Sequence, residues 1–225
     1  MFNDTRLPVP YPSESLAEGF RKTLGRAPKR QELEKLERYL GLLVQWNRVN
    51  RLTGYRAPGE IAEKLLLDSL LFLEVLPGSA RRVLDLGTGA GIPGIPVKIA
   101  APHIHLTLIE ARRRRGSFLA LVVRELGLDR VVLLRGRAEK LILEQPDLRG
   151  AFDAVLSRGF GPLETTVVLA QHFLKPGGAF IASGPPVHAG SLTLSETSAS
   201  WKLVSSPLRP HSRRFLVVEK ARSGN

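Results

Sequence analysis

The sequence predicts an α/β protein: a mostly parallel sheet with an antiparallel C-terminal strand pair, preceded by an N-terminal helical extension. From about residue 80, short β-rich apolar runs alternate with helical segments, which is typical of a parallel sheet with helices on both faces. Before that point, apolar residues recur at helical spacing. Near the C-terminus, two apolar runs are joined by a turn rich in proline and arginine. We therefore expect the extension over residues 1–78 and the α/β domain over residues 79–225.

The extension is expected to contain two helices. The first has charged residues between apolar ones three or four positions apart, at Leu33, Leu36, Leu40, Leu43 and Trp46. The second, near residues 60–76, is apolar on more than one face and should lie deeper in the protein. Pro58-Gly59 separates the two helices and Pro77-Gly78 ends the second, because proline and glycine interrupt regular structure.

The α/β domain is expected to alternate strands with helices before the C-terminal pair. Strands are predicted over residues 83–86, 106–109, 131–134, 152–156 and 179–182. Helices are predicted between them, over residues 96–100, 113–126, 138–144 and 162–173. The last two strands are predicted over residues 201–204 and 215–219, and pairing at the edge of the sheet is their simplest placement.

Composition excludes several chemistries. The 225 residues include no cysteine, which rules out disulfides, cysteine-ligated zinc or iron–sulfur sites and covalent thiol catalysis. Lysine and arginine number 33 against 21 acidic residues, and the net charge of +12 favours nucleic acid or an anionic membrane surface as a partner. A basic protein without such a partner would carry the same charge, so charge does not decide between these possibilities.

No targeting or membrane segment is expected. The first 15 residues contain Asp4, Glu14 and scattered prolines, without the apolar core of a signal peptide. The longest apolar stretch, residues 61–76, is interrupted by charged residues and is too short to span a bilayer. We therefore expect a cytoplasmic protein.

The most informative segment is VLDLGTGAGIPG, residues 83–94, in which a buried strand leads into a glycine loop and then a helix. In an open parallel sheet, ligands bind beyond the carboxyl ends of the strands. Read from Gly89, the loop matches the G-x-G-x-x-G fingerprint of NAD-binding proteins, with Glu110 as the acid that binds the ribose.

Two features of the loop count against NAD. Asp85 would place a negative charge where a pyrophosphate binds, and Pro93 disturbs the turn whose N–H groups would hold it. An acid beside this loop suits the sulfonium and ammonium groups of S-adenosylmethionine (SAM). The loop favours SAM and leaves NAD open.

Residues after the next strands complete the candidate site. Glu110 can accept both ribose hydroxyls, and the N–H of Ala138 with the carboxylate of Glu139 can read an adenine edge. After the fourth strand, Arg158 can contact a carboxylate or phosphate and Phe160 can stack on a base. These residues also have purely structural explanations. Glu110 could be an acid that faces solvent, and Glu139 an acid that the helix dipole favours in a first turn. Arg158 and Phe160 could be a surface arginine and a core aromatic residue.

Seven segments of the chain form a specific combination. They are WNRVNRLT at 46–53, LDSL at 67–70, VLDLGTGAGIPGIP at 83–96, LTLIE at 106–110, RAE at 137–139, SRGF at 157–160 and RFLVVE at 214–219. Together they resemble the RsmG (GidB) family, the bacterial 16S ribosomal RNA guanine-N7 methyltransferases. The resemblance runs from about residue 32 to residue 220, and the glycine segment together with SRGF is much more specific than a glycine loop.

The resemblance implies a class I SAM-dependent methyltransferase, with a Rossmann-like fold and SAM as its cofactor. It implies 16S ribosomal RNA or the small ribosomal subunit as the partner, with no metal and no membrane, and we expect a monomer. The cofactor-binding positions of the family map onto Gly87, Ile92, Glu110, Ala138, Glu139 and Arg158.

The missing cysteine also bears on the reaction. Methylation of a pyrimidine ring carbon by covalent addition needs a thiolate, and the fourth strand lacks the Asn/Asp-Pro-Pro-aromatic sequence of enzymes that methylate exocyclic amino groups. Guanine N7 has an in-plane lone pair and no proton to lose, so its methylation needs placement and desolvation instead of a base. We therefore expect no residue that acts as a catalytic nucleophile or obligatory base.

The chain departs from the family pattern where substrate handling is expected. The family usually has Asn at Arg51, His at Leu65, Lys at Ser183 and His at Phe215. Two alternatives to the 16S guanine-N7 activity therefore stay open. They are a SAM-dependent methyltransferase with a different RNA target and a weakly active, SAM-binding, ribosome-associated protein.

Basic residues flank the predicted site and continue onto the extension. We expect them together to bind RNA phosphates, with strong salt dependence and little sequence choice. For any single one of them, a solvated surface position is the simpler explanation. They are Lys22, Arg26, Lys29, Arg30, Arg48, Arg51, Arg56, Arg81, Arg82, residues 112–115, Arg135, Arg137, Arg209, Arg213 and Arg214.

Overall fold

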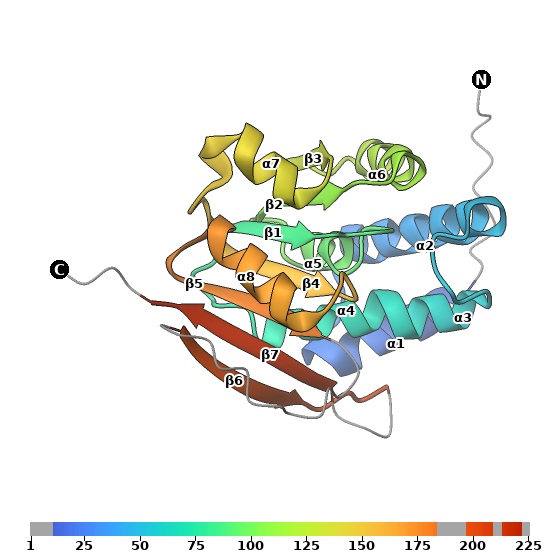
Figure 1. Cartoon of the computed structure of the whole chain (residues 1–225). Coiled ribbons are helices and arrows are strands. Elements are labelled where there is room, and N and C mark those ends of the chain that lie inside the picture. The colour runs from blue at the N-terminus through green and yellow to red at the C-terminus, as the bar shows by residue number, and fades with distance from the viewer. Residues whose placement is uncertain (1–10, 184–196, 209–212, 222–225) are drawn as a thin grey trace.

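Within the residues that the computed structural model describes, 11–183, 197–208 and 213–221, seven strands form one sheet (Figure 1). They are β1 (Arg82–Leu86), β2 (His105–Glu110), β3 (Val131–Arg135), β4 (Phe152–Arg158), β5 (Leu174–Ser183), β6 (Thr197–Val204) and β7 (Arg213–Lys220). Their order is β3-β2-β1-β4-β5-β7-β6. Strands β1 to β5 are parallel, and β7 pairs antiparallel with both β5 and β6. The predicted fold class is confirmed, with the antiparallel pair at the sheet edge.

Helices cover both faces of the sheet (Figure 1). One face is covered by α7 (Ala138–Glu144) and α8 (Leu163–Phe173), and the other by α1 (Ser13–Leu24), α2 (Arg30–Asn50), α5 (Gly94–Ala100) and α6 (Arg113–Glu125). Side chains of a strand alternate between its two faces, so neighbouring residues join different cores. In β1, Val83 lies in the hydrophobic cluster that contains Leu36 and Leu40 of α2, whereas Leu84 lies in the cluster under α7 and α8. The extension and one face of the sheet thus share one continuous core.

The extension differs from its prediction in two places. The periodic pattern does not predict α1, whose buried apolar face is confined to Leu16 and Phe20. The segment near residues 60–76 is a series of short helical turns: α3 (Pro58–Ile61), a π-helical turn (Ala62–Leu67), α4 (Asp68–Leu70) and a 3-10 turn (Leu71–Glu74). Burial on several sides explains the irregular pitch, because tertiary contacts and not one amphipathic stripe decide where each turn lies. The result places Asp68 in the interior, 3% exposed.

Two shorter features complete the described chain. A 3-10 turn (Pro146–Leu148) joins α7 to β4. No helix in the described ranges is both long and apolar enough to cross a membrane.

Candidate functional site

A cleft of about 540 Å³ lies where the carboxyl ends of β1, β2 and β4 meet the first turns of α7 and α8. We call it the carboxyl-edge cleft. Its volume falls in the range of small-molecule and cofactor sites. It is lined by Gly87, Ile109, Glu110, Ala111, Arg112, Arg115, Gly136, Arg137, Ala138, Glu139, Gly159, Phe160, Gly161, Pro162, Thr165, Thr166 and Leu169.

Gly87 forms the floor of the cleft directly after β1. Its φ of +70° lies in the left-handed region that side chains other than glycine rarely adopt. A Cβ atom at this position would stand 1.9 Å from Cδ2 of the Phe160 ring. Two features therefore favour glycine here: the backbone conformation and the close approach of Phe160. Phe160 itself lines the cleft.

The structure contradicts the expectation that Asp85 places its charge at the mouth of the glycine loop. The residue is fully buried, and its Oδ2 accepts hydrogen bonds from the Thr88 hydroxyl at 2.6 Å and from the Gly94 N–H at 2.8 Å. Its side chain follows Val83 toward the face that carries the extension, because residues two apart on a strand share a face. Asp85 therefore ties the two ends of the glycine loop together from beneath, and its charge does not face the cleft.

Burial raises the pKa of Asp85 from 3.8 to about 7, against the lowering effect of its two hydrogen-bond donors. Between these two values the folded state holds a proton that the unfolded state has released, so stability falls as the pH rises from about 4 to about 7. We predict that Asp85→Asn removes this dependence. From pH 5 to pH 8, the unfolding free energy of the wild type should fall by roughly 2.5 kcal/mol relative to the variant. Urea unfolding of both proteins at the two pH values measures this change. If the unfolding free energies of wild type and variant differ by the same amount at pH 5 and pH 8, the raised pKa is wrong.

Glu110 lies at the end of β2, buried in the wall of the cleft. Its Oε2 accepts a hydrogen bond from the Gly89 N–H at 3.0 Å, and its Oε1 accepts one from the Arg112 N–H at 2.7 Å. Nη1 of Arg115 is 3.9 Å from Oε2. Each carboxylate oxygen keeps a further lone pair for a hydroxyl group. Glu110 thus fastens the glycine loop to β2 and retains the acceptors that a ribose diol requires.

Ala138 and Glu139 begin α7 at the other end of the cleft. Ala138 is buried and Glu139 is exposed, and both line the cleft. The first N–H groups of a helix have no acceptor within the helix. A backbone donor and a carboxylate acceptor therefore meet here, the combination that suits the edge of an adenine. Four of the six predicted cofactor-binding residues, Gly87, Glu110, Ala138 and Glu139, are brought to one cleft.

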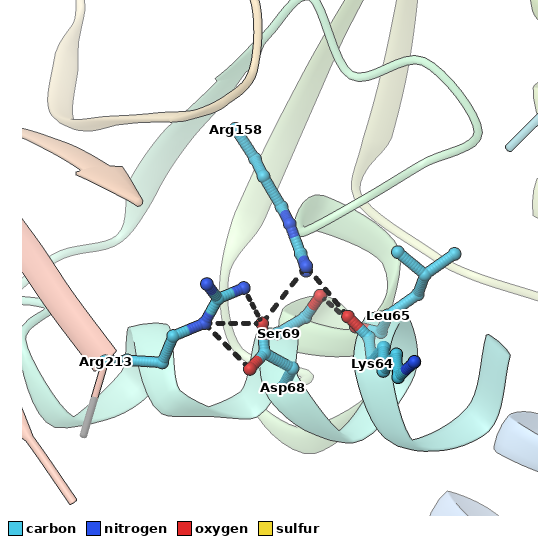
Figure 2. Close-up of polar contacts among 6 residues, drawn as sticks. All are labelled: Lys64, Leu65, Asp68, Ser69, Arg158 and Arg213. Carbon is cyan, nitrogen blue, oxygen red and sulfur yellow. Dashed lines mark hydrogen bonds and ion pairs between the residues drawn. The ribbon is translucent and has the colours of Figure 1, made fainter. Parts of the chain in front are cut away.

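The other two predicted residues, Ile92 and Arg158, lie outside the cleft lining. Ile92 is buried in the hydrophobic cluster shared with the extension. Arg158, the last residue of β4, follows Leu156 onto the face that the extension covers. Its Nη2 lies 3.1 Å from Oδ2 of Asp68 and donates a hydrogen bond to the carbonyl oxygen of Lys64 at 2.7 Å (Figure 2).

Asp68 joins three parts of the fold. Besides contacting Arg158 of β4, it accepts hydrogen bonds from Nε of Arg213 at 2.9 Å and 3.1 Å and from Nη2 of Arg213 at 2.5 Å (Figure 2). The side chains of Asp68, Arg158 and Arg213 are 2%, 16% and 19% exposed. We call these three residues the Asp68 cluster. Sequence reasoning missed the pairing, although an aspartate within an apolar run signals a buried carboxylate that needs a cation.

The departures from the family pattern fall in two regions. Ser183 of β5 pairs in register with both Arg158 of β4 and Phe215 of β7, next to the Asp68 cluster. Phe215 is buried edge-on against Phe72, with ring centroids 4.9 Å apart. Leu65 is also buried, and its carbonyl accepts a hydrogen bond from the Ser69 hydroxyl.

Arg51 lies apart from these residues, at the C-terminal end of α2. Gly184, which follows Ser183, and Arg209 of the predicted basic set lie outside the described residues. Over the described part of the chain, no group of three or more His, Asp or Glu side chains is arranged to hold a metal ion.

The chain is similar in sequence to known proteins of one family. Residues 32–187 match the model of the family described as rRNA small subunit methyltransferase G. The ribosomal RNA small subunit methyltransferase G of Sorangium cellulosum is 38% identical over 183 residues, which cover 78% of this chain and 76% of the relative. The protein of the same name from Moorella thermoacetica is 37% identical over 182 residues, covering 80% of this chain and 75% of the relative.

Solved structures show the same fold at low sequence identity. An O-methyltransferase from Bacillus cereus in complex with SAH has a TM-score of 0.59 at 16% identity, and the match covers 92% of this chain and 97% of that one. The O-methyltransferase TomG from Streptomyces achromogenes in complex with SAM has a TM-score of 0.55 at 18% identity, covering 98% and 100%. The fold is that of the class I SAM-dependent methyltransferases.

Proposed function

The chain belongs to the family of ribosomal RNA small subunit methyltransferases G, and from this premise we propose that it transfers the methyl group of SAM to N7 of a guanine in 16S ribosomal RNA. The observation that carries the proposal is the family match over residues 32–187, which includes the glycine loop and the acid of the carboxyl-edge cleft. We propose a cytoplasmic enzyme that acts on 16S ribosomal RNA or the small ribosomal subunit, as a monomer.

The residues of the cleft fit SAM as cofactor. Glu110 offers acceptors for two ribose hydroxyls, and the start of α7 offers a donor and an acceptor for adenine. The floor at Gly87 has no room for a side chain beneath Phe160. When bound, SAM supplies an electrophilic methyl group on a sulfonium centre. Ile92 and Arg158 do not line the cleft, so we assign them supporting positions behind it.

The proposed reaction requires no proton transfer to or from a side chain of the protein. Guanine N7 attacks with a lone pair and loses no proton, so the protein has to bring the two reactants into line and exclude water. Among the described residues that line the cleft there is no histidine, and the two carboxylates, Glu110 and Glu139, have the binding roles described above. We therefore propose that no side chain acts as a nucleophile or an obligatory base. Orientation of the reactants can supply roughly 7–11 kcal/mol of barrier reduction in the best cases.

In vitro methylation tests the function directly. Undermodified 16S ribosomal RNA and 30S particles are incubated with the purified protein and labelled SAM, and the RNA is digested for nucleoside analysis. We expect label in N7-methylguanosine. Label in another nucleoside would mean a different target. SAM binding without label in either substrate would mean a ribosome-associated binding protein.

A further inference from the structure

A second cavity, of about 710 Å³, lies next to the carboxyl-edge cleft at the C-terminal end of α2. We call it the basic pocket. It is lined by Val44, Asn47, Arg48, Arg51, Leu52, Thr53, Gly54, Arg56 and Arg115. Four of these residues are arginines and none is acidic. Arg115 also lines the carboxyl-edge cleft, so the two cavities share a wall.

The three pocket arginines that lie on the extension form no ion pair with the described residues. Other basic residues of the predicted RNA-binding set form ion pairs: Arg26 with Glu32 at 2.8 Å, and Arg30 with Glu34 at 2.7 Å. Arg48, Arg51 and Arg56 are exposed and have no carboxylate partner within the described ranges. Three unneutralised guanidinium groups around a hollow create a strong positive potential there.

Hydrogen bonds from side chains hold the backbone of the turn that carries Arg51 and Arg56. The buried Asn47 accepts a hydrogen bond from the Thr53 N–H at 2.8 Å and donates one to the Tyr55 carbonyl at 2.7 Å. The Thr53 hydroxyl in turn accepts a hydrogen bond from the Tyr55 N–H at 2.9 Å. These bonds fix the backbone of the turn, so the positions from which Arg51 and Arg56 project are set before any ligand arrives. A preorganised site loses less entropy when it binds.

Arg51 stands at the boundary between α2 and this turn. It caps α2 in the left-handed conformation, with a φ of +46°. At the ends of α1 and α6 the chain places glycine in this conformation, at Gly25 and Gly127. A side chain there costs about 1 kcal/mol relative to glycine. The left-handed residue ends α2 at the pocket, so the turn over residues 51–56 follows the helix directly.

We propose that the basic pocket binds the phosphodiester backbone of the RNA substrate beside the nucleotide that enters the carboxyl-edge cleft. The inference rests on the proposed function and extends it, because it names the surface that positions the strand. Arginine binds phosphate oxygens through paired N–H groups, and a hollow that shares a wall with the cleft suits a strand that enters both. A flat anionic membrane surface would not reach into the hollow. Phosphate contacts position the RNA without choosing its sequence.

The test compares two variants of the full chain, each of which removes three positive charges. The pocket variant is R48A/R51N/R56A, in which asparagine tolerates the left-handed conformation of residue 51. The control variant is R124A/R130N/R149A, at the opposite, amino edge of the sheet. It also replaces a left-handed arginine, because Arg130 has a φ of +51°. Affinity for deproteinised 16S ribosomal RNA is measured from low to moderate salt, together with affinity for SAM and for phosphatidylglycerol vesicles.

The pocket variant should bind the RNA at least tenfold more weakly, and the slope of log affinity against log salt should become shallower by about two. Its SAM affinity should stay within twofold, and the control variant should bind RNA like the wild type. The proposal would be overturned if both variants lost RNA affinity equally, or if the pocket variant lost affinity only for the vesicles. The wild type could also fail to methylate N7 of guanine while its RNA binding still depends on the pocket arginines. That result would overturn the proposed function but not the proposal that the pocket binds RNA.

Discussion

Replacing Glu110 by alanine is expected to weaken SAM binding at least a hundred-fold. Two hydroxyl-to-carboxylate hydrogen bonds would be lost, each worth about 1.5–3 kcal/mol because the acceptor is charged. The substitution also removes the acceptor of the Gly89 and Arg112 N–H groups, so the glycine loop loses its attachment to β2. Equilibrium SAM binding by titration calorimetry measures the effect.

A second substitution separates loss of ribose binding from loss of the loop. Glu110→Gln keeps one carbonyl acceptor but turns an amide N–H₂ toward a backbone donor, so SAM affinity should fall between that of the wild type and that of Glu110→Ala. Thermal unfolding of both variants checks that the fold is retained. SAM affinity of a folded Glu110→Ala variant within threefold of the wild type would show that the carboxylate does not bind the ribose.

Much of the sheet could be predicted because most of its strands are buried on both faces, although β3 at the edge is only partly buried. Strands of this kind are continuous apolar runs, and the five parallel strands were each located to within a few residues except β5, which begins earlier, at Leu174. The position of Glu110 followed from the same logic, since the last residue of a parallel strand lies at the carboxyl edge whatever the rest of the chain does.

Side-chain direction could not be predicted in the same way. Asp85 and Arg158 lie close to strand ends, yet both point to the face that the extension covers and not into the carboxyl-edge cleft. Their direction depends on the alternation along each strand and on which face α1 and α2 occupy, and that is long-range information. The broken helix around Asp68 has the same origin, because a segment buried on several sides carries no single periodicity that reveals its pitch.

Asp68→Ala is expected to destabilise the protein by about 3 kcal/mol or more, because removing one partner of a buried ion pair leaves the other charge uncompensated. Here the guanidinium groups of Arg158 and Arg213 would lose the carboxylate that lies between them. For a chain of this size the loss corresponds to a fall in the unfolding temperature of roughly 6–12 °C. Urea unfolding monitored by circular dichroism measures it.

Glu125 provides a matched control because its carboxylate also contacts two arginines, Arg38 at 2.6 Å and Arg124 at 3.4 Å, but its side chain is 28% exposed. Glu125→Ala should therefore cost less than about 1 kcal/mol, as exposed ion pairs do. A double-mutant cycle of Asp68→Asn with Arg213→Gln then isolates the pair itself. If Asp68→Ala costs no more than Glu125→Ala, or if the cycle shows no coupling, the Asp68 cluster does not fasten the extension to β4 and β7. A large coupling would mean that the end of β4, which leads directly into the Gly159–Gly161 wall of the carboxyl-edge cleft, is held in place from the extension.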